Sequence, residues 1–247
     1  MDSFTKPPEC SYNAGMYSVL YFIIGAIIGS FINMLASRLV SDKPLITYRS
    51  KCNNCSTSIA WYDLIPVLSY IWLRGKCRNC KTQIPIYFPV IEVFFGLIIL
   101  ILFTYEPLSM ITVLKLLCLG LLTVCSITDA LSYHVYNKVL YPMIAVVITL
   151  WFVSGANLYM IAQALILLAF IFVLASIVRL IKKEKTIGDG DYFIFFCIGL
   201  LFAYEDIISI ILFSSVAGII LSIIFRKKAL PFIPLLQLGI MATYVWR

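Results

Sequence analysis

The sequence predicts an all-α polytopic membrane protein with about eight transmembrane helices and one small polar insertion after the first helix. Of the 247 residues, 62% are hydrophobic and 13% are charged, which is outside the usual range of soluble globular domains. Apolar runs long enough to cross a bilayer recur from Met16 almost to the C-terminus. Runs such as "LILLAFIFVLASIV" lack the alternation of a membrane β-strand. Helices are therefore expected rather than a barrel.

Eight apolar segments account for the predicted helices. They are Met16–Ser37, Pro89–Tyr105, Leu108–Ile127, Lys138–Val153, Leu158–Leu180, Tyr192–Ala203, Ile207–Phe225 and Pro231–Trp246. The first segment is too long for the core of a signal peptide, and Lys6 is the only basic residue before it, so we interpret it as a retained anchor. The sixth and eighth segments are short, and re-entrant helices would have the same length.

Lysine and arginine indicate the orientation, because they concentrate in the short cytoplasmic loops of membrane proteins. With the N-terminus outside, the inner segments hold Arg38, Lys43, Arg49, Lys51, Arg74, Lys76, Arg78, Lys81, Lys138, Arg179, Lys182, Lys183, Lys185, Arg226, Lys227 and Lys228. The outer side holds Lys6, Arg247 and the acidic Glu106, Glu205 and Asp206. We therefore interpret the net charge of +7 as an orientation signal and expect lipid headgroups, not nucleic acid, as its partner.

The polar insertion, residues 38–88, carries four cysteines in two C-x2-C pairs. These are Cys52, Cys55, Cys77 and Cys80, in "KCNNC" and "KCRNC". Two such pairs predict a zinc ion held by four thiolates, and four protein ligands leave no open position, so the zinc would be structural. Free thiols or redox chemistry are the alternatives, whereas disulfides are disfavoured in the reducing cytosol. Within the spans, Cys118, Cys125 and Cys197 are expected to be core residues, and Cys10 has no expected partner.

Two carboxylates are expected at the same membrane depth. Asp129, in "SITDALSYHVYN", ends the third segment on the inner side, and Asp191, in "GDGD", begins the sixth segment on that side. Ionisable groups at such a position are costly, and a function is the default hypothesis. Two carboxylates within hydrogen-bond reach share a proton, so that one can activate water while the other polarises a carbonyl group. The pair therefore predicts aspartic-protease chemistry.

The motif around Asp191 has competing interpretations. Gly188 and Gly190 allow unusual dihedral angles and the close approach of another backbone, such as an extended substrate. Taken alone, G-x-G-D equally fits a cytoplasmic turn in which Asp191 caps the next helix. Asp189 is the rival carboxylate, expected in the loop and in solvent. His134 is the only histidine, so a Ser-His triad or a histidine-ligated metal has little support.

With these residues identified, the chain resembles the type IV prepilin peptidases, membrane aspartic proteases that also methylate the new N-terminus. The resemblance runs through "GSFINMLASRL", the block from "RSKCNNC" through "WYDLIPVLSY" to "RGKCRNC", "TDALSYHVYN" and "GDGD". It implies a bacterial inner-membrane enzyme with a periplasmic N-terminus. Such an enzyme cleaves the basic leader of type IV prepilins or pseudopilins after a glycine, at the cytosolic face. It then methylates the product with S-adenosylmethionine.

The resemblance also assigns residues and domains. It implies that Asp129 and Asp191 are catalytic and that the four cysteines of the insertion bind zinc. It places methyl transfer at the cytosolic insertion and the nearby helix ends, without assigning a residue to S-adenosylmethionine. The implied domains are 1–37, a tail and first helix; 38–88, the zinc domain; and 89–247, the protease domain. The sequence departs from the family where Tyr136, Phe193 and the "SRLV" motif replace a proline, a lysine and "YRLP".

Two other function classes remain as alternatives. In an ion transporter, Asp129 and Asp191 would bind a proton or cation between helices, but inverted repeats would be expected. In a membrane-anchored zinc adaptor, the insertion would bind a partner protein, and both aspartates would have no role. Cleavage of a prepilin leader by the solubilised protein distinguishes these classes.

Overall fold

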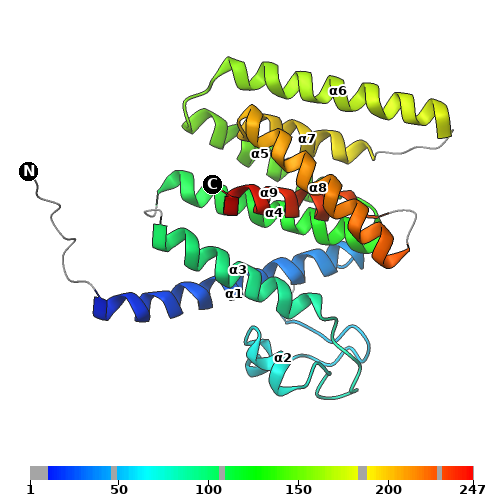
Figure 1. Ribbon diagram of the computed structural model, residues 1–247. Helices are drawn as coiled ribbons and strands as arrows, with labels where there is room; N and C mark the ends of the chain where they lie inside the picture. Colours follow the sequence, from blue (N-terminus) through cyan, green and yellow to red (C-terminus); the bar gives the residue numbers. More distant parts are fainter. Residues whose placement is uncertain (1–10, 46–48, 106–108, 183–187, 227–229, 247) are drawn as a thin grey trace, which may run out of the picture. The chain divides into compact units, whose positions relative to one another are not determined.

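The computed structural model describes residues 11–45, 49–105, 109–182, 188–226 and 230–246 (Figure 1). Its helices are α1 (Ser11–Val40), the 3-10 helix η1 (Trp61–Leu64), α2 (Leu68–Trp72), α3 (Tyr87–Tyr105), α4 (Met110–Ser132), α5 (Asn137–Val153), α6 (Leu158–Lys182), α7 (Asp189–Leu201), α8 (Tyr204–Phe225) and α9 (Phe232–Trp246). Extended pairing in these ranges is limited to the isolated bridges Lys51–Ser58 and Lys76–Gln83. The predicted all-helical class is confirmed. Predictions about Lys6, Cys10, Glu106, Lys183, Lys185, Lys227, Lys228 and Arg247 fall outside the described residues.

Each of the eight predicted apolar segments coincides with a helix, but the helices differ in length. Four are long and apolar enough to cross a membrane, namely Tyr17–Val40, Met110–Ser132, Leu158–Ile181 and Tyr204–Phe225. Three shorter apolar helices cover Tyr87–Phe103, Asn137–Val153 and Phe232–Thr243. The remaining helix, α7, has 13 residues. The structure therefore supports a membrane protein in which four of the eight helices that coincide with apolar segments are candidate spans and four are shorter.

Helix α4 continues beyond the predicted end of its apolar segment at Ile127. The helix begins with Ser109 as its N-cap and ends where Tyr133 adopts a left-handed conformation with a φ of 55°. The N–H of Tyr133 donates to the Asp129 carbonyl oxygen at 2.8 Å, which closes the last turn. Hydropathy marks where apolar residues stop, but a backbone cap decides where a helix stops. As a result, Asp129 lies inside α4, one turn before its end.

The chain divides into two compact units. The first comprises Met1–Asn33 and Ile46–Leu108, and thus groups the cysteine-rich insertion with α3 and most of α1. Within it, α1 and α3 pack closely at Gly25 and Gly29. A Cβ atom on Gly25 would collide with the Phe95 carbonyl oxygen, and one on Gly29 would lie 2.8 Å from the Ile91 carbonyl oxygen. Glycines four residues apart let two membrane helices approach backbone to backbone.

The second unit comprises Met34–Leu45 and Ser109–Arg247. In it, α4 packs against α5 and α9, α7 packs against α5 and α6, and α8 packs against α9 (Figure 1). Small residues again allow close contact, since a Cβ atom on Gly199 would lie 2.6 Å from Ala164 Cα. Polar side chains also connect helices, because Gln237 Nε2 of α9 donates to Thr123 Oγ1 of α4 at 2.6 Å. Helices α4 and α7, which carry the two candidate aspartates, both contact α5.

Candidate active site and metal centre

Asp129 is a buried carboxylate on α4, with 7% of its surface exposed. Its Oδ2 accepts a hydrogen bond of 3.0 Å from the N–H of Ile233, the second residue of α9. The first N–H groups of a helix lack partners within the helix and carry partial positive charge, so they stabilise an anion. Asp129 thus lies at the positive end of α9, which no feature of its own segment predicts.

Asp191 is half-buried and is the third residue of α7. Its Oδ2 accepts a hydrogen bond of 3.1 Å from the N–H of Gly188, the residue that precedes the helix. The helix cap considered from the sequence is therefore present. A cap of this kind fixes the orientation of the carboxyl group, so capping and a chemical role are compatible.

The structure brings the two carboxylates into one part of the second unit. Asp129 lies close enough to Asp191 for their charges to interact. The segments that carry them also touch, since a Cβ atom on Gly190 would lie 2.9 Å from Val135 Cβ. Val135 belongs to the short connection that follows α4. The connection after the first aspartate therefore packs on the turn that carries the second.

The glycines of the G-x-G-D motif act differently from the prediction. Gly188 has a φ of −72°, and the described glycines with positive φ are Gly75 and Gly155, so the expected unusual dihedral angles are absent from the motif. Gly190 does allow another group to approach closely, but that group is the side chain of Val135 and not the backbone of a substrate. Asp189 is exposed as expected, although it begins α7 instead of lying in a loop.

Four of the remaining sequence candidates also have described positions. His134 is exposed in the connection between α4 and α5. Cys125 and Cys197 are buried core residues, as predicted, whereas Cys118 is only partly buried.

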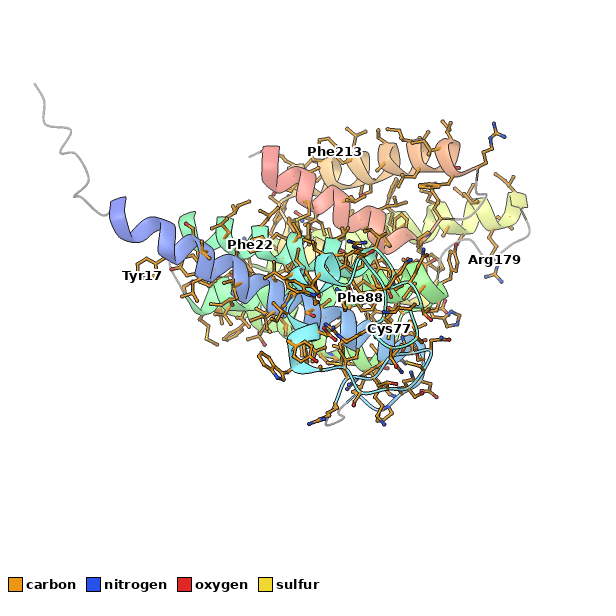
Figure 2. All side chains as sticks on the ribbon, turned by 90° about the horizontal axis from the view of Figure 1, so that it is seen from below. Tyr17, Phe22, Cys77, Phe88, Arg179 and Phe213 are labelled. Carbon is orange, nitrogen blue, oxygen red and sulfur yellow. The ribbon has the colours of Figure 1, made fainter. Side chains whose placement is uncertain are left out.

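The four cysteines of the insertion lie together, and their sulfur atoms are all within 4.8 Å of one another. Cys52 Sγ and Cys80 Sγ are 3.8 Å apart. A tetrahedron with Zn–S bonds of about 2.3 Å has edges of about 3.8 Å, so this separation fits a zinc ion between the two sulfurs. Figure 2 shows Cys77 in the loops of this unit. The donor set and its spacing fit structural zinc.

The two C-x2-C segments form matching loops joined by reciprocal hydrogen bonds. The N–H of Cys52 donates to the Thr57 carbonyl oxygen at 3.0 Å, and the N–H of Cys77 donates to the Thr82 carbonyl oxygen at 2.9 Å. Between the loops, Asn54 Nδ2 donates to Thr82 Oγ1 at 2.8 Å. The equivalent bond from Asn79 Nδ2 to Thr57 Oγ1 measures 2.9 Å. Each loop therefore supports the other around the metal position.

The threonines of these loops also favour the thiolate form that binds metal. A hydrogen bond with Thr82, whose Oγ1 lies 3.3 Å from Cys80 Sγ, lowers the pKa of the Cys80 thiol to about 5. The equivalent hydrogen bond with Thr57 lowers the pKa of Cys55. Thiolates are the ligands of zinc, so these hydrogen bonds favour the metal-binding form of Cys55 and Cys80.

The backbone donor at Ile233 is not predicted by the sequence. Pro231 and Pro234 flank this position and are typical of a helix start, so the beginning of α9 could have been found. Its partner could not, because Asp129 lies 104 residues earlier in the chain.

Comparison with known proteins identifies the family. Residues 23–105 match the bacterial peptidase A24 N-terminal domain, and residues 116–223 match the type IV leader peptidase family. A prepilin leader peptidase/N-methyltransferase of Vibrio cholerae is 30% identical over 83% of this chain and 85% of its own length. Proteins of the same name from Myxococcus xanthus and Dickeya chrysanthemi are 25% and 24% identical, over 86% and 83% of this chain.

The aligned region spans 64% of the Myxococcus protein and 81% of the Dickeya protein. Solved structures gave no match. The two family models together extend from α1 to α8, and the Vibrio relative aligns along most of both chains. The chain belongs to the type IV leader peptidase family, that of the prepilin leader peptidases.

Proposed function

We propose that this protein is a membrane aspartic endopeptidase that removes the basic leader of type IV prepilins or pseudopilins at the cytosolic face of the bacterial inner membrane. One observation carries the proposal: the connection that follows Asp129 packs on the turn that carries Asp191, where a Cβ atom on Gly190 would lie 2.9 Å from Val135 Cβ, in a chain of this family. Each carboxylate is held by a backbone N–H, which limits its motion. Two fixed carboxylates that share a proton suit hydrolysis of a peptide bond.

The chemistry requires no group beyond the two carboxyls and water. The ionised carboxylate takes a proton from water, and the water oxygen attacks the carbonyl carbon of the scissile bond. The protonated carboxyl meanwhile donates to the carbonyl oxygen. Collapse of the tetrahedral intermediate breaks the C–N bond: the leaving amine takes the proton that the first carboxylate took from water, and a hydroxyl of the intermediate returns a proton to the other carboxylate. The four cysteines lie in the other compact unit, consistent with a structural and not a catalytic metal.

We further propose that the protein methylates the new N-terminus of the cleaved pilin. The relatives carry N-methyltransferase in their names. S-adenosylmethionine would supply the methyl group, and the cytosolic insertion with the nearby helix ends is the proposed location. Transfer of a labelled methyl group to a cleaved pilin peptide tests this activity separately from cleavage.

The proposal is tested with the purified protein and a synthetic prepilin leader peptide. Asp129→Asn and Asp191→Asn are each expected to lower cleavage by at least about 1,000-fold, because a lone carboxyl has no partner with which to share the proton. Asp189→Asn is the matched control, since it alters an exposed carboxylate of the same motif, and most of its activity should remain. Zinc content and detergent-solubilised yield would verify that each variant is folded. Substantial cleavage by either catalytic variant would refute the pair.

A further inference from the structure

The cysteine-rich insertion exposes an apolar surface that zinc binding does not explain. Trp61, Leu68, Ile71 and Trp72 are 78%, 65%, 65% and 83% exposed, and we call this surface the Trp61–Trp72 face. Neither η1 nor α2 buries a single residue. Isolated apolar residues are normal on a protein surface, but two tryptophans and two aliphatic side chains within twelve residues indicate a binding face.

A buried hydrogen bond fixes the level of this face along α3. The N–H of Val67, which precedes α2, donates to Glu92 Oε2 at 2.7 Å, and Glu92 is 7% exposed. Glu92 is the sixth residue of α3, so the bond lies about 7 to 8 Å along the helix from its first residue. Val67 has a φ of 63°, which is unfavourable for a β-branched residue and is held in place here by Glu92. The start of α2 thus lies beside the first turns of an apolar helix (Figure 1).

The exposed residues of α3 are apolar as well, and so is Ile86, the residue directly before this helix. Ile86 and Val90 are 66% and 57% exposed, and Leu97 and Ile101, further along the helix, are 47% and 56% exposed. These are the side chains that a predicted membrane helix presents to lipid. Val67, in the middle of the segment that carries the Trp61–Trp72 face, therefore lies level with the first turns of this apolar helix.

The charge of the insertion complements a lipid surface. Residues 49–86 contain six basic residues and one acidic residue, Asp63. Asp63 is already bound by Arg78, which donates to its two carboxylate oxygens at 2.9 and 2.7 Å. Lys51, Arg74, Lys76 and Lys81 remain exposed. Lysine and arginine are attracted to anionic headgroups, and tryptophan favours the boundary between headgroups and acyl chains.

We propose that the Trp61–Trp72 face inserts into the headgroup–acyl boundary of the adjacent leaflet, so that the cysteine domain is a membrane-surface domain and not a lobe free in water. The proposal goes beyond the peptidase activity and does not depend on it. Amphipathic surfaces of this kind bind through buried apolar area together with attraction to anionic lipid. The bond between Val67 and Glu92 sets the depth of insertion.

Quenching of a single tryptophan by brominated lipid tests the proposal. The full-length, zinc-loaded protein carries Trp61→Phe, Trp151→Phe and Trp246→Phe, which leaves Trp72, and is reconstituted in vesicles of phosphatidylethanolamine and phosphatidylglycerol. Lipids brominated at acyl carbons 6 and 7 are expected to quench at least about half of the Trp72 fluorescence. The control replaces all four native tryptophans with phenylalanine and adds Asn53→Trp, a reporter at an exposed, uncharged position of the first cysteine loop that should be quenched little.

The zinc content of each variant verifies that the domain is folded. Trp72 fluorescence that is insensitive to brominated lipid but quenched by aqueous acrylamide would overturn the proposal. Protection of Trp72 that requires an added prepilin peptide would also overturn it, because the face would then be a substrate surface.

Discussion

At the scale of single residues, the two aspartates have similar supports from different parts of the chain. Asp129 accepts a hydrogen bond from Ile233 at the start of α9, and Asp191 accepts one from Gly188 at the start of its own helix. Both carboxylates therefore lie where partial positive charge from a helix N-terminus compensates their burial. The sequence predicts the local bond of Asp191 through the capping pattern. It cannot predict the bond of Asp129, whose donor is a backbone group far away in the chain.

Two substitutions of Ile233 distinguish the contribution of its N–H from that of its side chain. Ile233→Pro removes the donor, and proline is tolerated in the first turn of a helix, where Pro234 already stands. Ile233→Ala removes a similar side chain but keeps the N–H. We expect the proline variant to cleave a prepilin peptide at least about tenfold more slowly than the alanine variant, because a hydrogen bond to a charged group contributes about 1.5 to 3 kcal/mol. Equal rates would show that the bond to Asp129 has no role in cleavage.

Thr82 offers a similar test at the metal site. It contacts the Cys80 sulfur and accepts a hydrogen bond from Asn54 of the other loop. Thr82→Val keeps the shape and removes the hydroxyl, so zinc affinity should fall about 10- to 100-fold, as is usual when a group that supports a metal ligand is lost. Competition with a chromogenic zinc chelator measures the affinity. Thr82→Ser should bind nearly as tightly as the natural protein, and an unchanged affinity in the valine variant would contradict the assigned role.

At the scale of helices, the sequence predicts which segments are helical better than it predicts the residues at which each helix begins and ends. Every apolar segment coincides with a helix, because burial in lipid requires the backbone to satisfy its own hydrogen bonds. Hydropathy predicts that α4 ends and α7 begins where the apolar residues do, whereas the structure places the caps at Tyr133 and Gly188. These shifts bring Asp129 and Asp191 into helices. The paired C-x2-C segments predict the cysteine cluster, whereas the reciprocal asparagine–threonine bonds depend on how the two loops face each other.

The contact between α1 and α3 can be tested with two glycines in different surroundings. In Gly29→Ala the new methyl group meets the backbone of Ile91 and Glu92, whereas in Gly218→Ala it meets the flexible end of Leu235 at 3.2 Å. Both changes raise helix propensity equally, so the difference between them reports packing. We expect Gly29→Ala to be less stable by about 1 to 3 kcal/mol, measured by thermal unfolding in detergent. If both variants unfold at the same temperature, the close contact does not stabilise the protein.

At the scale of the whole molecule, composition and charge predict a membrane protein, and the four long apolar helices agree. Helices α3, α5, α7 and α9 are shorter than a typical span, and their pairing with long helices could not be deduced from hydropathy. Hydropathy also does not predict the division into two units, in which α3 belongs with the cysteine domain. Packing partners depend on shape complementarity between distant segments, and local sequence does not encode that directly.

Orientation is predicted by the basic loops and can be measured with single cysteines. In a background with Cys10, Cys118, Cys125 and Cys197 changed to serine, Ala130→Cys places a thiol beside Asp129 at an exposed position. A membrane-impermeant thiol reagent should label it in inside-out vesicles and not in intact cells.

The matched control is Tyr204→Cys, at the beginning of α8, where an exposed side chain is replaced at the opposite end of the helices. It should be labelled in intact cells. Labelling of Ala130→Cys from the outer face would overturn both the orientation and cleavage in the cytosol.

The bond between Asp129 and Ile233 also has a consequence for the timing of biosynthesis. The carboxylate is synthesised and inserted with α4, but its donor is made 104 residues later, after α5, α6, α7 and α8. Asp191 is made between the two. While the chain is emerging from the ribosome, both aspartates can therefore be in the membrane before α9 holds the first of them. A nascent peptidase of this design acquires its full arrangement only when translation has passed α9, so its maturation is timed by its own synthesis.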